Sequence, residues 1–395
     1  MSAQELAELH RELRAVARDL LRRNAAKAGP DQTYATVDWS LLADTGWLGL
    51  EVPEELDGAG ASFAEVAVVL HEFGRAAAST PFLGSAVLGV GALRLLEPGP
   101  GRDELLRAVA AGSERITLAL PTGDDDAAVF RASPVGASAP GATAPGAAAP
   151  GTGGRVTAGS VVVSGLADFV PDAVGAEQLL LLAHDEAGVP VVLRVRPTDP
   201  GVTVTARPVL DETRDFGTVA VENATVDADS VWRFRGDGPA PAAEAARGLR
   251  DRAALAMACD ALGLAEAMLE ATVEYAGTRR QFGRPIGSFQ AVKHACADMF
   301  VKITVGRELL DAAVQAVAGD EPDAWVAVSR AKSQVGAAAV EVAGAAMQLH
   351  GGIGYTWEGG VHVYLKRALL GRSLFGAPAA HRARLATRFT SAEPA

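Results

Sequence analysis

Hydrophobic positions in the first part of the chain recur at the spacing of a helix. In the N-terminal segment they fall on one face: Leu6, Leu13, Val16, Leu20 and Leu21. A second helix is predicted over residues 63–75, and a third over 103–111, after a Pro-Gly stop. We therefore expect an N-terminal helical domain over residues 1–115.

The hydrophobic period changes to an alternating one between residues 116 and 235. The runs ITLAL, VVVSG, LLLLAH, VVLRV, VTVTA and TVAVEN are rich in Val and Leu and are separated by turn residues, which is typical of β-strands. This pattern predicts a middle β domain, folded as a barrel or a sandwich. Within it, residues 132–154 repeat Ala-Pro-Gly, a composition that builds no core and predicts a flexible loop.

Long helical patterns return over residues 236–395. Four segments are long enough for a four-helix bundle: 243–278, 288–318, 321–349 and 360–390. The sequence thus predicts an α+β chain of several lobes, with helices first, a β domain in the middle and a helical bundle at the end.

Composition narrows the possible functions. The chain has 395 residues and a net charge of −12, which disfavours binding to nucleic acid. Its two cysteines, Cys259 and Cys296, lie in apolar helical patterns and are expected to be buried free thiols. We expect no membrane span and a cytoplasmic location, because the N-terminal segment lacks an apolar signal core. The histidines show no metal-ligand spacing, so no metal site is predicted.

One segment, YAGTRRQFGRPIGSFQ at 275–290, combines features of an anion site. Arg279 and Arg280 stand at the predicted end of a helix, where paired guanidinium groups can bind a pyrophosphate. Gly283 follows in a turn, and Phe282 offers a flat apolar face. Taken singly, such arginines usually face solvent and such glycines usually end helices.

A second segment, QLHGGIGYTWE at 348–358, has matching chemistry. Gln348, like Gln290 in the first segment, carries an amide that donates and accepts hydrogen bonds. Gly351 and Gly352 remove side chains where a ligand could approach the backbone closely. No dinucleotide-binding GxGxxG sequence follows a predicted strand.

Together with WSLLADTGWLGLEVPEELDGAGASFAEVAVVLHEFGR at 39–75, these segments resemble the three signatures of the acyl-CoA dehydrogenase family, in the family's order. The resemblance covers nearly the whole chain. It implies FAD as cofactor, an acyl-CoA substrate and an electron-transfer flavoprotein as electron acceptor. It also implies contacts from Arg279, Phe282, Gln290, Gln348, Gly351 and Gly352 to the pyrophosphate and adenosine half of FAD. In this family that FAD commonly belongs to a neighbouring subunit of a tetramer.

The family reaction is the α,β-desaturation of an acyl thioester, in which a carboxylate removes a Cα proton and the flavin accepts a hydride from Cβ. The two positions where members carry the catalytic Glu correspond to about Phe375 and about Ala253, and neither holds an acid. Asp251 is turned about 200° away from Ala253 on a helix. Asp260 is the candidate substitute base, although pairing with an Arg or Lys of the bundle is the preferred interpretation.

The β domain also departs from the family. LALPTGDDD at 118–126 stands where members read like LTEPxxGSD, and DFVPDA at 168–173 replaces a second flavin-facing segment. Phe169 can still pack on a ring, whereas Pro171 replaces a Thr hydroxyl and has no N–H. Residues 211–214, Asp-Glu-Thr-Arg, resemble a β-domain motif that supports the fold.

Three hypotheses follow. The first is a subunit of a heteromeric acyl-CoA dehydrogenase whose partner supplies the carboxylate, as in bacterial members that form heterotetramers and act on steroid side chains. The second is a self-sufficient homo-oligomer with a displaced base such as Asp260, and the third a non-catalytic structural subunit. Small residues at 253–265 are compatible with a bulky acyl group. A flavin monooxygenase on the same fold has no residue in its favour.

Overall fold

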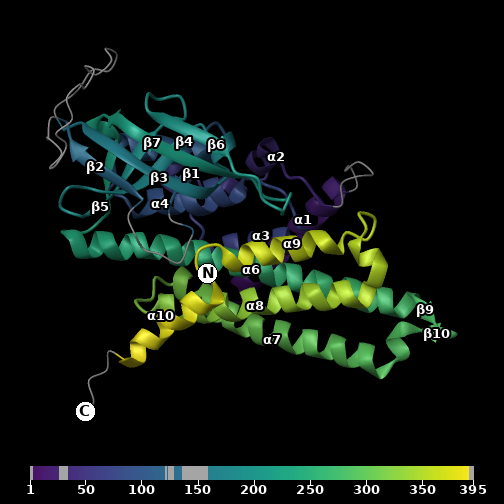
Figure 1. Ribbon diagram of the computed structural model, residues 1–395. Helices are drawn as coiled ribbons and strands as arrows, with labels where there is room; N and C mark the ends of the chain where they lie inside the picture. Colours follow the sequence, from purple (N-terminus) through teal and green to yellow (C-terminus); the bar gives the residue numbers. More distant parts are fainter. Residues whose placement is uncertain (1–2, 26–33, 121, 123–128, 136–158, 391–395) are drawn as a thin grey trace, which may run out of the picture.

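The computed structural model describes residues 3–25, 34–120, 122, 129–135 and 159–390, and it confirms the helix–sheet–helix order (Figure 1). The N-terminal helices lie between a twisted sheet and a long C-terminal bundle. Two groups of buried apolar side chains hold the parts together. One runs through the N-terminal helices and α6 to α9 and onto one face of the sheet, and the other lies within the sheet.

Helices dominate the first 110 residues, as predicted. They are α1 (Ala3–Ala25), α2 (Trp39–Asp44), α3 (Phe63–Arg75), the π-helix η3 (Leu83–Gly89), α4 (Val90–Leu95) and α5 (Pro100–Ala110), with the 3₁₀ turns η1 (Trp47–Gly49) and η2 (Glu54–Leu56). Helix α3 has the predicted bounds because Ser62 and Glu65 form a capping box that satisfies its first N–H groups.

The middle of the chain forms an eight-stranded sheet. Its strands are β1 (Ile116–Ala119), β2 (Phe130–Pro134), β3 (Val161–Pro171), β4 (Gln178–His184), β5 (Pro190–Val195), β6 (Val202–Ala206), β7 (Phe216–Val226) and β8 (Val231–Arg233). The order is β6-β7-β3-β2-β4-β5-β8, and β1 pairs in parallel with β4. The predicted flexible loop began too early, because residues 132–134 pair with β3; its remainder from 136 lies outside the described residues.

The C-terminal bundle consists of α6 (Pro239–Thr278), α7 (Gln290–Ala318), α8 (Ala324–His350), α9 (Val361–Ser373) and α10 (Pro378–Thr390). The prediction of one helix over 360–390 was wrong. The chain leaves the helix at Leu374, takes positive φ angles at Phe375 and Gly376, and starts again at Pro378. Proline lacks the N–H that a continuous helix needs, so it starts the new helix instead.

Small residues let α3 and α6 cross at very short range. A Cβ atom added at Gly74 would lie 1.9 Å from the carbonyl oxygen of Asp260, and one at Gly263 would lie 1.9 Å from that of His71. The residues from 253 to 265 are buried in this crossing. The small side chains of this stretch therefore serve helix packing.

A buried ion cluster joins the sheet to the bundle. Asp260 on α6 accepts hydrogen bonds from Arg367 on α9, at 2.6 Å from Nη2, and pairs at 3.0 Å with Arg214 from the β6–β7 connection. Arg367 also donates to the Thr213 hydroxyl and to the carbonyl of Ala78. Three separate parts of the chain thus meet at one carboxylate.

Replacing Arg367 with Met is expected to lower the free energy of unfolding by about 3–5 kcal/mol, because it leaves the buried Asp260 without its main partner. Urea unfolding followed by fluorescence measures this loss. The neighbouring Lys366 is the control, since its side chain is partly exposed and Lys366→Met should change stability by less than about 1 kcal/mol. Equal effects of the two changes would contradict the central role of the cluster.

Candidate functional site

The segment proposed to bind the adenosine half of FAD forms a small hairpin at the end of α6. Arg279 is the first residue after the helix and is exposed. Strands β9 (Arg280–Gln281) and β10 (Arg284–Pro285) follow, and Phe282 lies at the tip with 91% of its surface exposed. Phe282 and Gly283 both have positive φ angles, which a tight turn requires.

The second segment ends α8 beside this hairpin. Gln348 is exposed on the last turn of the helix, and Gly351 reverses the chain with a φ of 61°. A Cβ atom at Gly351 or Gly352 would meet nothing within 4 Å, so both glycines border open space. Tyr275 stacks on His350 at 4.5 Å and thereby ties the end of α6 to the end of α8.

The structure brings the six predicted cofactor-binding residues to one end of the bundle; Gln290 starts α7 at the same end. Figure 1 shows that this end, marked by β9 and β10, projects away from the sheet of the same chain. A cofactor between the sheet and the bundle of this chain would lie at the opposite end of α6. Contact of these residues with FAD stays a prediction.

Both positions where family members carry the catalytic Glu are used for packing in this chain. Ala253 is fully buried in α6, and Phe375 is 3% exposed within the main apolar core. The N–H of Phe375 donates to the carbonyl of Thr122 at 2.7 Å, and its carbonyl lies 3.0 Å from Nε2 of His381. The segment resembling the base region thus contacts the segment resembling a flavin-facing strand directly.

Asp260 has the surroundings of a structural carboxylate. Burial alone would raise the pKa of Asp260, but the facing charges of Arg214 and Arg367 hold it below its ordinary value. A carboxylate with a lowered pKa, enclosed by two guanidinium groups, is a poor acceptor for a Cα proton. The structure therefore favours the ion-pair interpretation of Asp260 over that of a displaced base.

The sequence analysis set Asp251 aside, but the structure places it beside Phe375. Asp251, Phe375 and Gly376 line one cavity of about 180 Å³, together with Arg247 and Arg250. The break between α9 and α10 brings Phe375 and Gly376 to the cavity that Asp251 lines. Both carboxylate oxygens of Asp251 are bonded by Arg384. Asp251 is nevertheless a carboxylate that lines the same cavity as Phe375 at the family position.

Residues 168–173, which replace the family's second flavin-facing segment, contact other groups of the protein. Phe169 has a φ of 54° and packs edge-on against Phe216 at 6.3 Å, with the guanidinium of Arg207 at 5.2 Å from its ring. The carbonyl of Pro171 accepts a hydrogen bond from Thr117. Most of LALPTGDDD, namely residues 121 and 123–128, lies outside the described residues.

Other expectations are refined by the structure. Both thiols are free, but only Cys259 is fully buried, whereas Cys296 is half-buried on α7. Among the described residues, no three His, Cys, Asp or Glu side chains are arranged to hold a metal ion. None of the described helices combines the length and apolar composition needed to cross a bilayer.

Comparison with known proteins decides the family. The family model for the acyl-CoA dehydrogenase N-terminal domain matches residues 3–112, and that for the C-terminal domain matches residues 245–390. The chain belongs to the acyl-CoA dehydrogenase family. The acyl-CoA dehydrogenase IpdE2 of Mycobacterium tuberculosis is 30% identical over 87% of this chain and 83% of its own length.

Solved acyl-CoA dehydrogenase structures also match the chain along nearly its whole length. One is the ChsE4–ChsE5 complex from Mycobacterium tuberculosis, 27% identical with a TM-score of 0.79, covering 98% of both chains. The Tcur3481–Tcur3483 steroid ACAD has the same identity, coverage and TM-score. A glutaryl-CoA dehydrogenase from Mycobacterium smegmatis in complex with FADH2, 17% identical with a TM-score of 0.80, shares the fold.

FAD is the cofactor of the acyl-CoA dehydrogenase family. The described residues of this chain suit FAD at the end of the bundle and not beside the sheet. At the bundle end, exposed Arg279 and the open space at Gly351 and Gly352 suit a pyrophosphate that approaches the backbone. On the side of the sheet, Phe375 is buried against the core and Pro171 offers no N–H.

Phe375 should behave as a core residue. Replacing it with Ala is expected to lower stability by about 3–5 kcal/mol, because a large buried ring is lost and a cavity remains. Thermal and urea unfolding measure the change. Phe282→Ala is the matched control, since that ring is exposed and its loss should cost little in the isolated chain. A Phe375→Ala protein as stable as wild type would show that the ring does not fill this place.

Proposed function

We propose that this chain is a subunit of a heteromeric, FAD-dependent acyl-CoA dehydrogenase. A second, related chain supplies the catalytic carboxylate and the isoalloxazine contacts. This chain contributes the site formed by the ends of α6 and α8, which binds the pyrophosphate and adenosine of the partner's FAD. The observation that carries the proposal is the position of that site, at the end of the bundle away from its own sheet.

The exposed surface at this end supports a partner chain. Besides Phe282, the turn after α8 exposes Tyr355 by 71% and Trp357 by 47% of their surfaces. Exposed aromatic groups of this size, grouped around a basic hairpin, are typical of an interface core. Their burial against another subunit would remove this apolar area from water and place Arg279 beside the bound cofactor.

The absence of an acid at Phe375 and Ala253 supports a partner chain of different sequence. A homo-oligomer would repeat Phe375 and Ala253 at every active site. The carboxylates described near these positions, Asp251 and Asp260, are each bonded by arginines. A heteromer needs only one chain with a free carboxylate. The similar structures described as ChsE4–ChsE5 and Tcur3481–Tcur3483 each name two chains.

In such a complex the residues of this chain bind and orient the FAD of the partner chain. The guanidinium of Arg279 neutralises the pyrophosphate, and Gly351 and Gly352 let the backbone approach it. Phe282 covers the adenosine and excludes water, while Gln290 and Gln348 supply polar contacts. When bound, FAD accepts the hydride from Cβ of the acyl thioester. An electron-transfer flavoprotein then accepts the electrons, and steroid-derived acyl groups are the proposed substrate class.

The chain purified alone is expected to contain little FAD. The visible spectrum near the flavin bands measures this, before and after anaerobic addition of a panel of acyl-CoA thioesters. Co-expression with a second chain of the family should give a stable complex with flavin that a thioester bleaches. One FAD per isolated chain, bleached by a thioester, would instead show a self-sufficient enzyme, and Asp251 would be the first carboxylate to replace.

Arg279→Ala is expected to remove most FAD from the complex while leaving the complex assembled, because the pyrophosphate loses a charge-assisted hydrogen bond worth about 1.5–3 kcal/mol. Flavin absorbance per complex after gel filtration measures the loss. The control is Arg131→Ala, an exposed arginine on β2 of the sheet. Full flavin content in the Arg279→Ala complex would refute the shared site.

A further inference from the structure

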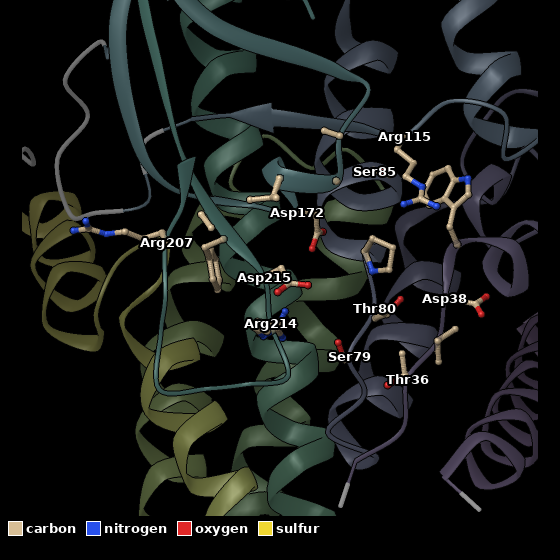
Figure 2. A pocket seen from close by; sticks show the side chains of 18 of the residues that line it. Thr36, Asp38, Ser79, Thr80, Ser85, Arg115, Asp172, Arg207, Arg214 and Asp215 are labelled. Carbon is tan, nitrogen blue, oxygen red and sulfur yellow. The ribbon is translucent and has the colours of Figure 1, made fainter. Parts of the chain in front are cut away.

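A pocket between the N-terminal helices and the sheet has no part in the function proposed above. It measures about 680 Å³ and is enclosed by the segment before α2, the turn before η3 and the β6–β7 connection. Figure 2 shows Asp172 and Asp215 near its middle, with Arg115 and Arg207 toward opposite ends. The pocket shares no lining residue with the cavity beside Phe375 or with the hairpin at the end of α6.

The arginines of this pocket are engaged with other groups. Arg115 lies over the ring of Trp39 at 5.5 Å and Arg207 over that of Phe169 at 5.2 Å, which holds both guanidinium groups on aromatic faces. Arg214 is paired with Asp260 in the buried cluster. The lining also carries five acidic side chains, which outnumber these three cations.

Buried polar atoms without partners border the pocket. Oδ2 of Asp211, a side chain only 2% exposed, makes no hydrogen bond in the described structure. The same holds for Nε of Arg214, whose side chain is 10% exposed, and for Oγ1 of Thr80. An unpaired buried carboxylate oxygen calls for a donor, and the unpaired guanidinium N–H calls for an acceptor.

Asp172 completes this arrangement. One of its oxygens accepts a hydrogen bond from the N–H of Gly84, at 2.7 Å, at the start of η3. Burial raises the pKa of Asp172 to about 7, and the nearby carboxylate of Asp215 acts in the same direction. A carboxyl group with this pKa gains a partner when a cation enters beside it.

We propose that this pocket binds a small organic ammonium ion that also carries a hydrogen-bond acceptor. The ammonium group lies among Asp172, Asp211 and Asp215, and the acceptor oxygen meets Nε of Arg214. Trp39 and Phe216 line apolar walls that suit the carbon skeleton of such a ligand.

Calorimetry with three compounds of one ring type tests the proposal on the full-length chain. Tyramine is the ammonium probe, p-cresol lacks the charge, and 4-hydroxyphenylacetate reverses it. We expect tyramine to bind at least about tenfold more tightly than p-cresol, and 4-hydroxyphenylacetate to bind most weakly, because the middle of the pocket is acidic. Equal binding of tyramine and p-cresol, tighter binding of the anion, or no heat from tyramine at millimolar concentration would overturn the proposal.

Substitutions of two exposed carboxylates test where tyramine binds. Asp215→Asn should weaken tyramine binding by about fivefold, the effect of one charge at about 4 Å near solvent. Asp229→Asn, in the turn before β8 and outside the pocket, should leave it unchanged. An unchanged affinity in Asp215→Asn, or equal losses in both variants, would place tyramine elsewhere and refute the assigned pocket. The flavin content of the complex tests the proposed function independently of tyramine binding.

Discussion

The placement of the sheet on the bundle depends on the charge of Asp260. A carboxylate buried to this degree must be paired, and its two partners come from α9 and from the β6–β7 connection. Neither partner is near α6 in the sequence, so the ion cluster can form only when all three parts have their native positions. It thereby fixes the angle between sheet and bundle and sets the positions of the residues around it.

A buried lysine lies between this cluster and the region of the family's catalytic position. Lys332 lies beside it, fully buried, with its pKa lowered to about 7 by burial and by the charge of Arg214. Its ammonium nitrogen donates to the carbonyl of Gly371, about one turn before the break that carries Phe375. The break is then held by His381 and Thr122. The region that performs chemistry in the family is thus used here to secure packing.

Periodicity predicted the helices and most strands because each reflects local burial on one face. Helix α3 has its predicted bounds since its cap lies within the sequence window. The break at Phe375 was missed because the surrounding apolar residues keep a helical spacing through Pro378. Asp251 was not selected from the sequence because its rotation around the helix does not predict which distant loop lies beside it. The acidic pocket was not predictable at all, since its walls come from segments more than 100 residues apart.

Local charge decides what the exposed end of the bundle can bind. The chain carries a net charge of −12, yet residues 278–290 hold three arginines and no acid. The guanidinium of Arg284 lies 4.1 Å above the ring of Phe289, and Arg280 points to the carbonyl of Gly283, so both brace the hairpin. Arg279 is left for a ligand. A cationic site on an otherwise acidic protein attracts a compact anion, and the diphosphate of a bound cofactor is such an anion.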